Sequence, residues 1–252
     1  MVASFPAPHA SLDGLDAALR ERGFAVLAPA SVAALAGVEV ADLDALASSW
    51  DDLLPDEYLK DGGRYRKRRH SCFVAEDGVL RQVPHRMHWQ SVDYNALHGG
   101  MQRWFEPVEP AVVAQPAWSK LLGALAQVFS RRMPVPRWSI EAHQFRIDTA
   151  DGLGRPTPEG AHRDGVDFVA VLLVARKGVK GGETRVFEAE GPRGQRFTLT
   201  QPWSLLLLDD ARMIHESTPI QPLTEGGYRD TLVVTYRRGN FQGADLPGQV
   251  PA

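Results

Sequence analysis

The sequence predicts a mainly β protein with flanking helices, built as a helix-supported β-sandwich or jelly roll. From residue 137 onward, short apolar or alternating segments follow one another, separated by glycine, proline and aspartate. Helical periodicity is found mainly ahead of them. We therefore expect one domain over residues 1–252, with helical support in roughly 1–136 and a jelly-roll core in roughly 137–240.

The expected helices carry apolar residues on one face and should pack on the outside of a sheet. They run from about residue 12 to Gly23, around 40–50, and over 111–129. The expected strands are either alternating or apolar throughout. They cover residues 24–27, 138–147, 167–176, 183–188, 196–200, 203–209 and 229–238.

Composition excludes several classes of function. The net charge is −3, so bulk electrostatics favour neither nucleic acid nor an acidic membrane as a partner. The single cysteine, Cys72, rules out an internal disulfide framework and a cysteine-based zinc site. No apolar segment approaches the length of a membrane span, and residues 1–14 lack the features of a secretory signal. We therefore expect a cytoplasmic protein.

A metal site is predicted where a proline- and glycine-rich loop, residues 157–160, leads into His162-x-Asp164. In an extended backbone these two side chains point the same way. His215, 53 residues after His162, completes a set of two histidines and one carboxylate. Such a set binds Fe(II) in non-haem oxygenases, and zinc in some hydrolases. The ligand types do not separate the two metals.

A carboxylate receptor is predicted at Arg229-x-Thr231, 14 residues after His215. Strand alternation places the two side chains on one face, and an arginine fork beside a hydroxyl suits a carboxylate close to the metal. A zinc hydrolase has no obvious need of this pair. The alternative is an arginine at a strand end that reaches solvent.

A dense basic run covers residues 64–70, and as a strand it places Arg64, Arg66, Arg68 and His70 on one face. This face either points into a pocket and binds a substrate carboxylate, or belongs to a solvated edge strand whose charges discourage aggregation. A second histidine pair, His85 and His88, follows Pro84 without a nearby carboxylate, so we assign it to the surface or to the support of a site.

The full series His162-x-Asp164, His215 and Arg229-x-Thr231 resembles the Fe(II)/2-oxoglutarate-dependent dioxygenases. The segments TPEGAHRDGVDFVAVLLVARKGVKGGETRVF, DDARMIHESTPI and YRDTLVVTYR are similar to the bacterial branch that includes L-isoleucine 4-hydroxylase and biofilm-stress homologues. The resemblance is strongest over about residues 140–238 and extends back to GGRYRKRRHSCF.

The resemblance implies a double-stranded β-helix, the jelly-roll variant of cupins. It also implies that the two histidines and the aspartate bind Fe(II), that Arg229 and Thr231 bind the far carboxylate of 2-oxoglutarate, and that dioxygen is the second cosubstrate. Hydroxylation of a small substrate would then accompany the conversion of 2-oxoglutarate to succinate and carbon dioxide.

The substrate expected from the resemblance is a free amino acid or a similar small polar molecule. A zwitterion needs a cation for its carboxylate and an acceptor for its ammonium group. The candidate contacts are Arg66, Arg68, Gln144, Arg146 and, near the metal, Asp210. Residues 91–116 are expected to form either a lid or an interface.

Two other classes of function remain open on the sequence. One is a zinc- or other metal-dependent hydrolase or lyase on a cupin-like barrel, which would act without dioxygen or 2-oxoglutarate. The other is a non-catalytic metal-binding regulatory module.

Overall fold

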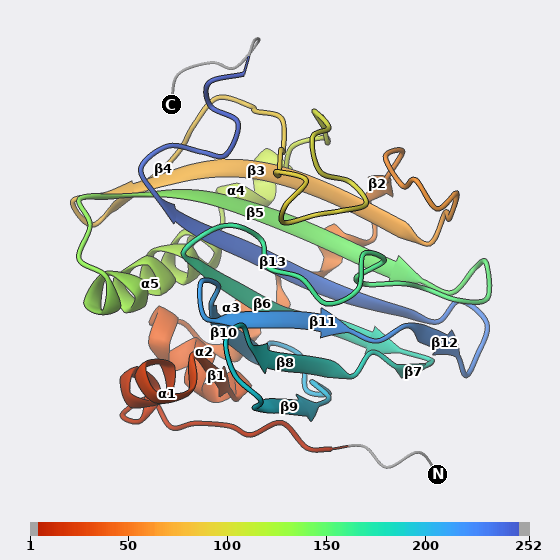
Figure 1. Cartoon of the computed structure of the whole chain (residues 1–252), viewed down its shortest axis with the longest axis horizontal. Helices are drawn as coiled ribbons and strands as arrows, with labels where there is room; N and C mark the ends of the chain where they lie inside the picture. The colour runs from red at the N-terminus through yellow and green to blue at the C-terminus, as the bar shows by residue number, and fades with distance from the viewer. Residues whose placement is uncertain (1–4, 247–252) are drawn as a thin grey trace.

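The computed structural model describes residues 5–246 (Figure 1). Its helices are α1 Leu15–Arg22, α2 Pro29–Ala36, α3 Val40–Asp44, α4 Pro110–Val113 and α5 Pro116–Arg132, with a 3-10 turn over Ala47–Trp50. Its strands are β1 Phe24–Leu27, β2 Leu54–Pro55, β3 Arg66–Glu76, β4 Val79–Gln82, β5 Arg137–Asp148, β6 Phe168–Lys177, β7 Val179–Gly181, β8 Thr184–Glu188, β9 Gly194–Phe197, β10 Leu205–Asp209, β11 Met213–Ser217, β12 Ile220–Pro222 and β13 Tyr228–Arg238.

The larger sheet has eight strands in the order β1-β10-β6-β13-β5-β3-β2, with β4 paired to β3. Neighbouring strands are antiparallel. The long central strands β13 and β5 pair over their whole lengths, so successive residues of β13 alternate between the two faces of the sheet. One face of this sheet packs against helices, and its other face lies opposite the smaller sheets.

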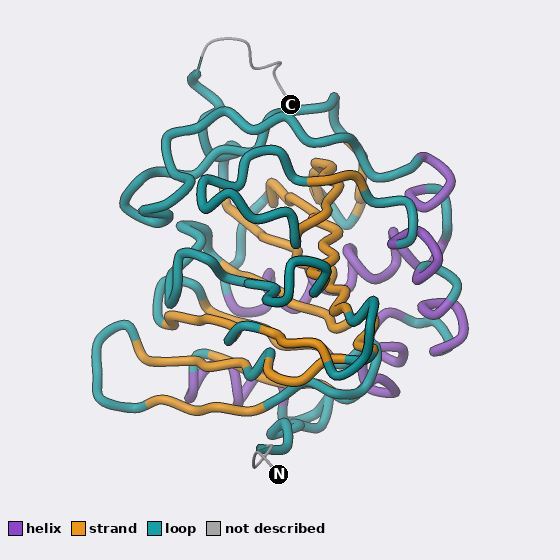
Figure 2. The backbone as a smooth tube through the Cα atoms, turned by 90° about the vertical axis from the view of Figure 1, so that its right-hand side faces the viewer, coloured by secondary structure: helices purple, strands orange, loops and turns teal. Residues whose placement is uncertain are grey.

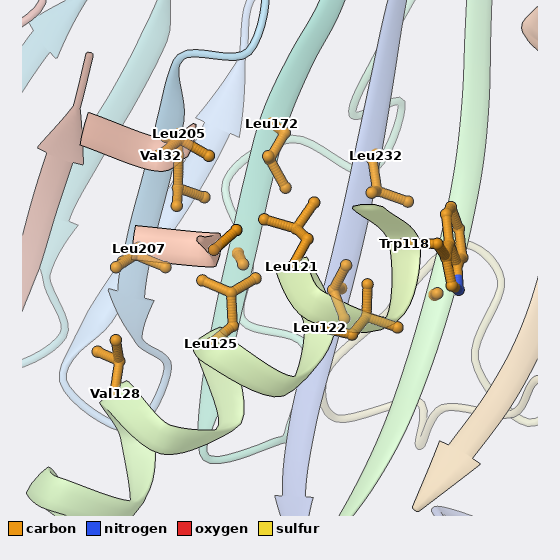
Figure 3. Packing of buried hydrophobic residues seen from close by; sticks show 14 of the residues in the cluster. Val32, Trp118, Leu121, Leu122, Leu125, Val128, Leu172, Leu205, Leu207 and Leu232 are labelled. Atoms are coloured by element: carbon orange, nitrogen blue, oxygen red, sulfur yellow. The ribbon is translucent and has the colours of Figure 1, made fainter. Parts of the chain in front are cut away.

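Helix α5 covers one face of the larger sheet (Figure 3). It begins with Pro116 at its first helical positions, where a missing N–H costs nothing. Leu121, Leu122 and Leu125 recur at helical spacing, and all are fully buried against residues of β6, β10 and β13 such as Leu232. Burying each leucine contributes about 1.5–3 kcal/mol, so this layer anchors the sheet that carries the site.

The smaller layer consists of a three-stranded sheet, β11-β8-β9, and the pair β12-β7. A second apolar cluster, which includes Val169, Val186 and Phe197, joins residues of the larger sheet to residues of the smaller one. Two facing antiparallel sheets form the predicted jelly roll. Figure 2 shows most of the helices on one side of the strands, in agreement with the predicted helical support.

Strands also occur ahead of residue 137, within the expected helical support. They are β1, β2, β3 and β4, and β3 pairs with β5 along its whole length, Arg66–Glu76. The predicted helix around 40–50 is instead α3 followed by the 3-10 turn, and α2 was not predicted. The extent of the single domain, 1–252, stays a prediction, since residues 1–4 and 247–252 lie outside the described range. No helix among the described residues is both long and apolar enough to span a membrane.

Candidate active site

Backbone pairing brings the two histidines of the predicted metal site together. The N–H of His162 donates to the carbonyl of His215 at 3.0 Å, and the reverse bond measures 2.9 Å. His215 lies in β11, which pairs with β8, so the segment around His162 extends the edge of the smaller sheet. Residues that face each other in such a pair project their side chains to one side. The ring centroids of the two histidines are therefore only 4.6 Å apart.

The three predicted ligands converge without bonding to one another. Asp164 places Oδ1 3.8 Å from Nε2 of His162 and Oδ2 3.7 Å from Nε2 of His215. These separations exceed hydrogen-bond lengths, but two atoms bound about 2.1 Å from one ion lie up to about 4.2 Å apart. Nδ1 of His162 donates to the carbonyl of Gly160 at 3.0 Å, which leaves the Nε2 lone pair free. The donor set therefore fits a divalent metal ion.

Asp164 is held in place from two directions. Nε2 of Gln90 donates to its Oδ1 at 3.1 Å. The carboxylate of Asp210 accepts backbone N–H bonds from Asp164, Gly165 and Val166 at 2.9, 2.8 and 3.1 Å. Gly165 has φ +75°, a conformation that glycine adopts without strain, and this turn aims three successive N–H groups at one carboxylate.

Arg229 and Thr231 lie side by side on β13 and line the same cavity as the three ligands. Both are buried, at 3% exposure each. The guanidinium of Arg229 makes no hydrogen bond or ion pair with a described residue, although its pKa, lowered by burial to about 10, keeps it charged at neutral pH. An unpaired buried cation beside a hydroxyl is a receptor for an anion.

The basic run forms one wall of the cavity. Arg66 and Arg68 are buried on β3, which has neighbouring strands on both sides along most of its length. The interpretation as a solvated edge strand was therefore wrong for these two residues. Nε of Arg66 donates to Oδ2 of Asp56 at 2.7 Å, and Nη1 of Arg68 lies 3.8 Å from the same oxygen. Although burial would raise the pKa of Asp56, these cations hold it below its usual value.

Arg68 is immobilised on both faces. Its guanidinium carbon lies 3.8 Å from the ring centroid of Phe105 and 4.4 Å from that of Phe145. Nη2 donates to Nδ1 of His143 at 2.8 Å, and Nε has no partner among the described residues. A stacked arginine with an unused donor is preorganised for a ligand.

A second buried cluster lies beside Arg68 and has the composition of a metal site: His70, His88, Glu141 and His143. Its contacts are different from those of the first cluster. Oε2 of Glu141 lies 2.9 Å from Nε2 of His70 and 2.7 Å from Nδ1 of His88, which are hydrogen-bond lengths. His143 accepts from Arg68 at Nδ1, so its Nε2 carries the ring proton and cannot ligate an ion. We interpret this cluster as a hydrogen-bonded network that supports Arg68.

Charges in this network are fixed by burial. Burial lowers the pKa of His70 and His143, and it lowers that of His88 to about 3, so the imidazoles are neutral. Burial alone would raise the pKa of Glu141, but its interactions with His88 and His70 hold it below its usual value. His88 therefore supports the cavity wall, one of the two roles that the sequence left open for it.

Residues 91–116 take part in the site, and their role as a lid or an interface stays a prediction. Together with Gln90, this segment supplies a wall of the cavity through Asn95, His98 and Arg103. Nη2 of Arg103 donates to Oε1 of Gln90 at 3.1 Å. The sequence showed no signal for these contacts, because they come from irregular backbone with no periodicity.

Three predicted substrate contacts lie outside the cavity. Gln144 and Arg146 face the other side of β5, where Gln144 donates to Oγ of Ser49 and Arg146 forks onto Asp230. Asp210 uses its carboxylate to hold the backbone that carries Asp164. These three predictions are therefore corrected, since their polar groups are occupied elsewhere.

Comparison with known proteins places the chain in a family. The profile of the 2OG-Fe dioxygenase family matches residues 47–235. A bsmA homologue from Methylobium petroleophilum PM1, known from its crystal structure, is 53% identical, with a TM-score of 0.90 over 94% of this chain and 97% of that chain. A search of curated protein sequences found no match.

More distant solved structures share the fold. IDO from Bacillus thuringiensis is 17% identical, with a TM-score of 0.75 over 91% of this chain and 100% of that chain. The Fe(II)/(alpha)ketoglutarate-dependent dioxygenase TqaL is 19% identical, with a TM-score of 0.70 over 92% and 88%. The chain belongs to the 2OG-Fe dioxygenase family: it is a non-haem iron enzyme that uses Fe(II), 2-oxoglutarate and dioxygen on a double-stranded β-helix.

Proposed function

We propose that this protein hydroxylates a free amino acid or a similar small polar molecule, with His162, Asp164 and His215 as the iron ligands. The observation that carries the proposal is that these ligands share one cavity with Arg229, which is buried and has no hydrogen-bond or ion-pair partner among the described residues. Bound iron, 2-oxoglutarate and dioxygen supply the oxidising chemistry. The protein's own residues bind and orient the reactants and exclude water from them.

The cosubstrate receptor in this proposal is the pair Arg229 and Thr231. The guanidinium of Arg229 and the hydroxyl of Thr231 would donate hydrogen bonds to the far carboxylate of 2-oxoglutarate. Both side chains project from β13, which the pairing with β5 and β6 keeps rigid. A zinc hydrolase would leave this buried cation without a partner, which disfavours the alternative.

The substrate receptor in this proposal is the opposite wall. Arg66, Arg68 and Arg103 line the cavity, and each has a buried guanidinium N–H without a partner among the described residues. Buried donors are rarely left unpaired in a folded protein, so a ligand carboxylate is the expected partner. Arg66 and Arg68 were candidates from the sequence, and Arg103 joins them because of its position.

A succinate-release screen over free amino acids and their simple derivatives tests the proposal. We expect succinate above the uncoupled background with at least one amino acid, and a matching product heavier by one oxygen atom. His162→Ala should abolish both signals because it removes a metal ligand, whereas His9→Ala, at an exposed histidine, should leave them unchanged. Turnover of a substrate without dioxygen or 2-oxoglutarate would instead support the hydrolase or lyase.

A further inference from the structure

Glu159 lies in the wall of the active-site cavity and receives no hydrogen bond from the described residues. Its side chain is 11% exposed, and no described residue donates a hydrogen bond to it. The nearest positively polarised group is the ring of His162, whose Nε2 lies 3.6 Å from Oε1. Its Oε2 is buried without a donor, which is costly to keep in a fold, so the position of this carboxylate requires an explanation.

His162 does not donate a hydrogen bond to this carboxylate when its Nε2 binds the metal ion of the proposed function. Its Nδ1 donates to the carbonyl of Gly160, so in the neutral ring Nε2 carries a lone pair rather than a proton. That lone pair serves the metal in the proposed function. His98, another cavity residue, does not offer a charge either, because burial lowers its pKa to about 4. In the metal-bound site the described residues therefore offer Glu159 no donor, and a bound ligand can supply one.

On the side of the cavity where we place the substrate, the positive and negative side chains are equal in number. Three buried guanidinium groups belong to Arg66, Arg68 and Arg103, and three carboxylates belong to Asp56, Glu141 and Glu159. Within residues 5–246, Asp56 and Glu141 accept hydrogen bonds, Glu159 accepts none, and each of the three arginines keeps an unused N–H. A ligand with one negative and one positive group leaves this balance unchanged, whereas a simple anion does not.

We propose that Glu159 binds the ammonium group of the substrate and makes the enzyme specific for a free α-amino group. This inference rests on the proposed function and narrows its substrate class. The carboxylate of the amino acid lies against the arginine wall and its ammonium group lies against Glu159, next to the metal ligand His162. An N-acylated amino acid or an internal peptide residue has no cationic donor at that position, so the enzyme rejects it.

The test compares wild-type protein with Glu159→Gln, which keeps the shape and removes the charge. Each free amino acid that releases succinate is assayed beside its N-acetyl derivative and its 2-hydroxy analogue. Binding is measured in parallel by equilibrium dialysis of the same compounds against the manganese-loaded protein with 2-oxoglutarate. Glu190→Gln, at an exposed glutamate, is the matched control.

For wild-type protein we expect turnover of the free amino acid, with the two analogues binding roughly 10- to 150-fold more weakly, the value of a hydrogen bond between charged groups. Glu159→Gln should weaken amino-acid binding by the same factor and abolish the preference over the 2-hydroxy analogue. Equal binding of free and N-acetylated compounds by wild-type protein, or an unchanged preference in Glu159→Gln, overturns the inference while the proposed function stands. Failure of every amino acid to bind or to release succinate overturns both.

Discussion

Nε2 of Gln90 donates a hydrogen bond of 3.1 Å to Oδ1 of Asp164, and so joins the long loop ahead of α4 to the predicted metal ligand. Oε1 of the same amide accepts from Asn95 and from Arg103, both at 3.1 Å. The amide therefore has one orientation, with its NH₂ group toward the carboxylate. A single side chain thus couples the ligand to the arginine wall of the cavity.

Gln90→Leu should weaken metal binding without unfolding the protein. The leucine fills a similar volume but leaves Oδ1 of Asp164 without its donor, so the carboxylate loses its fixed orientation. Loss of such outer contacts typically costs about 10- to 100-fold in metal affinity. Competition with a chromogenic chelator measures this value. The exposed Gln201→Leu variant is the control, and equal affinities in both variants would contradict the assigned role.

The buried histidine network predicts an acid-sensitive fold. The pKa of His88 is about 3 in the folded state and about 6.5 in the unfolded chain. Between these values only the unfolded state binds the proton, so the free energy of unfolding falls as the pH decreases below 6.5. From pH 6.5 to 5.0 the loss due to this one residue is about 1–2 kcal/mol. The lowered pKa values of His70 and His143 act in the same direction.

Urea unfolding of the metal-free protein at the two pH values measures this effect. His88→Gln should lose about 1–2 kcal/mol less than wild type over the interval, because its side chain does not titrate. His85→Gln replaces an exposed histidine and should behave as wild type. The same pH dependence in all three proteins would show that His88 is not a buried neutral imidazole.

Arg68→Lys should impair substrate binding selectively. Lysine keeps the charge but loses the planar fork, the stacking on Phe105 and Phe145, and the fixed bond to His143. We expect the Michaelis constant for the amino acid to rise by roughly 10-fold or more, while the Michaelis constant for the oxo-acid cosubstrate stays within about twofold of wild type. Arg64→Lys, at an exposed position on the same run, is the control. An equal rise of both constants would indicate a general structural defect instead.

Sequence patterns identified both the metal ligands and the carboxylate receptor. His162 and Asp164 were expected on one side of an extended segment, which in the structure is an isolated bridge at His162 rather than a strand, and Arg229 and Thr231 alternate on β13. The structure brings all four to one cavity together with His215. Alternation alone does not show which face of β5 lines the cavity. Gln144 and Arg146 were therefore assigned to the substrate, although they face away from the cavity.

Contacts made by irregular backbone could not be predicted in this way. Gln90, Arg103 and Glu159 reach the cavity from loops whose course depends on tertiary packing, and no period or motif marks them. The role of the basic run was undecided for a related reason. Whether β3 lies at an edge or inside a sheet depends on its partners, and β5 is about seventy residues away along the chain.

The central claim is that Arg229 receives 2-oxoglutarate beside iron bound by His162, Asp164 and His215. Addition of 2-oxoglutarate to the anaerobic Fe(II)-loaded protein, followed by visible absorption, tests it most directly. We predict a charge-transfer band for wild type and for the exposed Arg193→Ala control. For Arg229→Ala we predict no band, or a 2-oxoglutarate requirement at least about 30-fold higher, since one partner of a buried charge pair is gone. A folded, iron-loaded wild type without the band, or an unchanged titration in Arg229→Ala, would contradict the account.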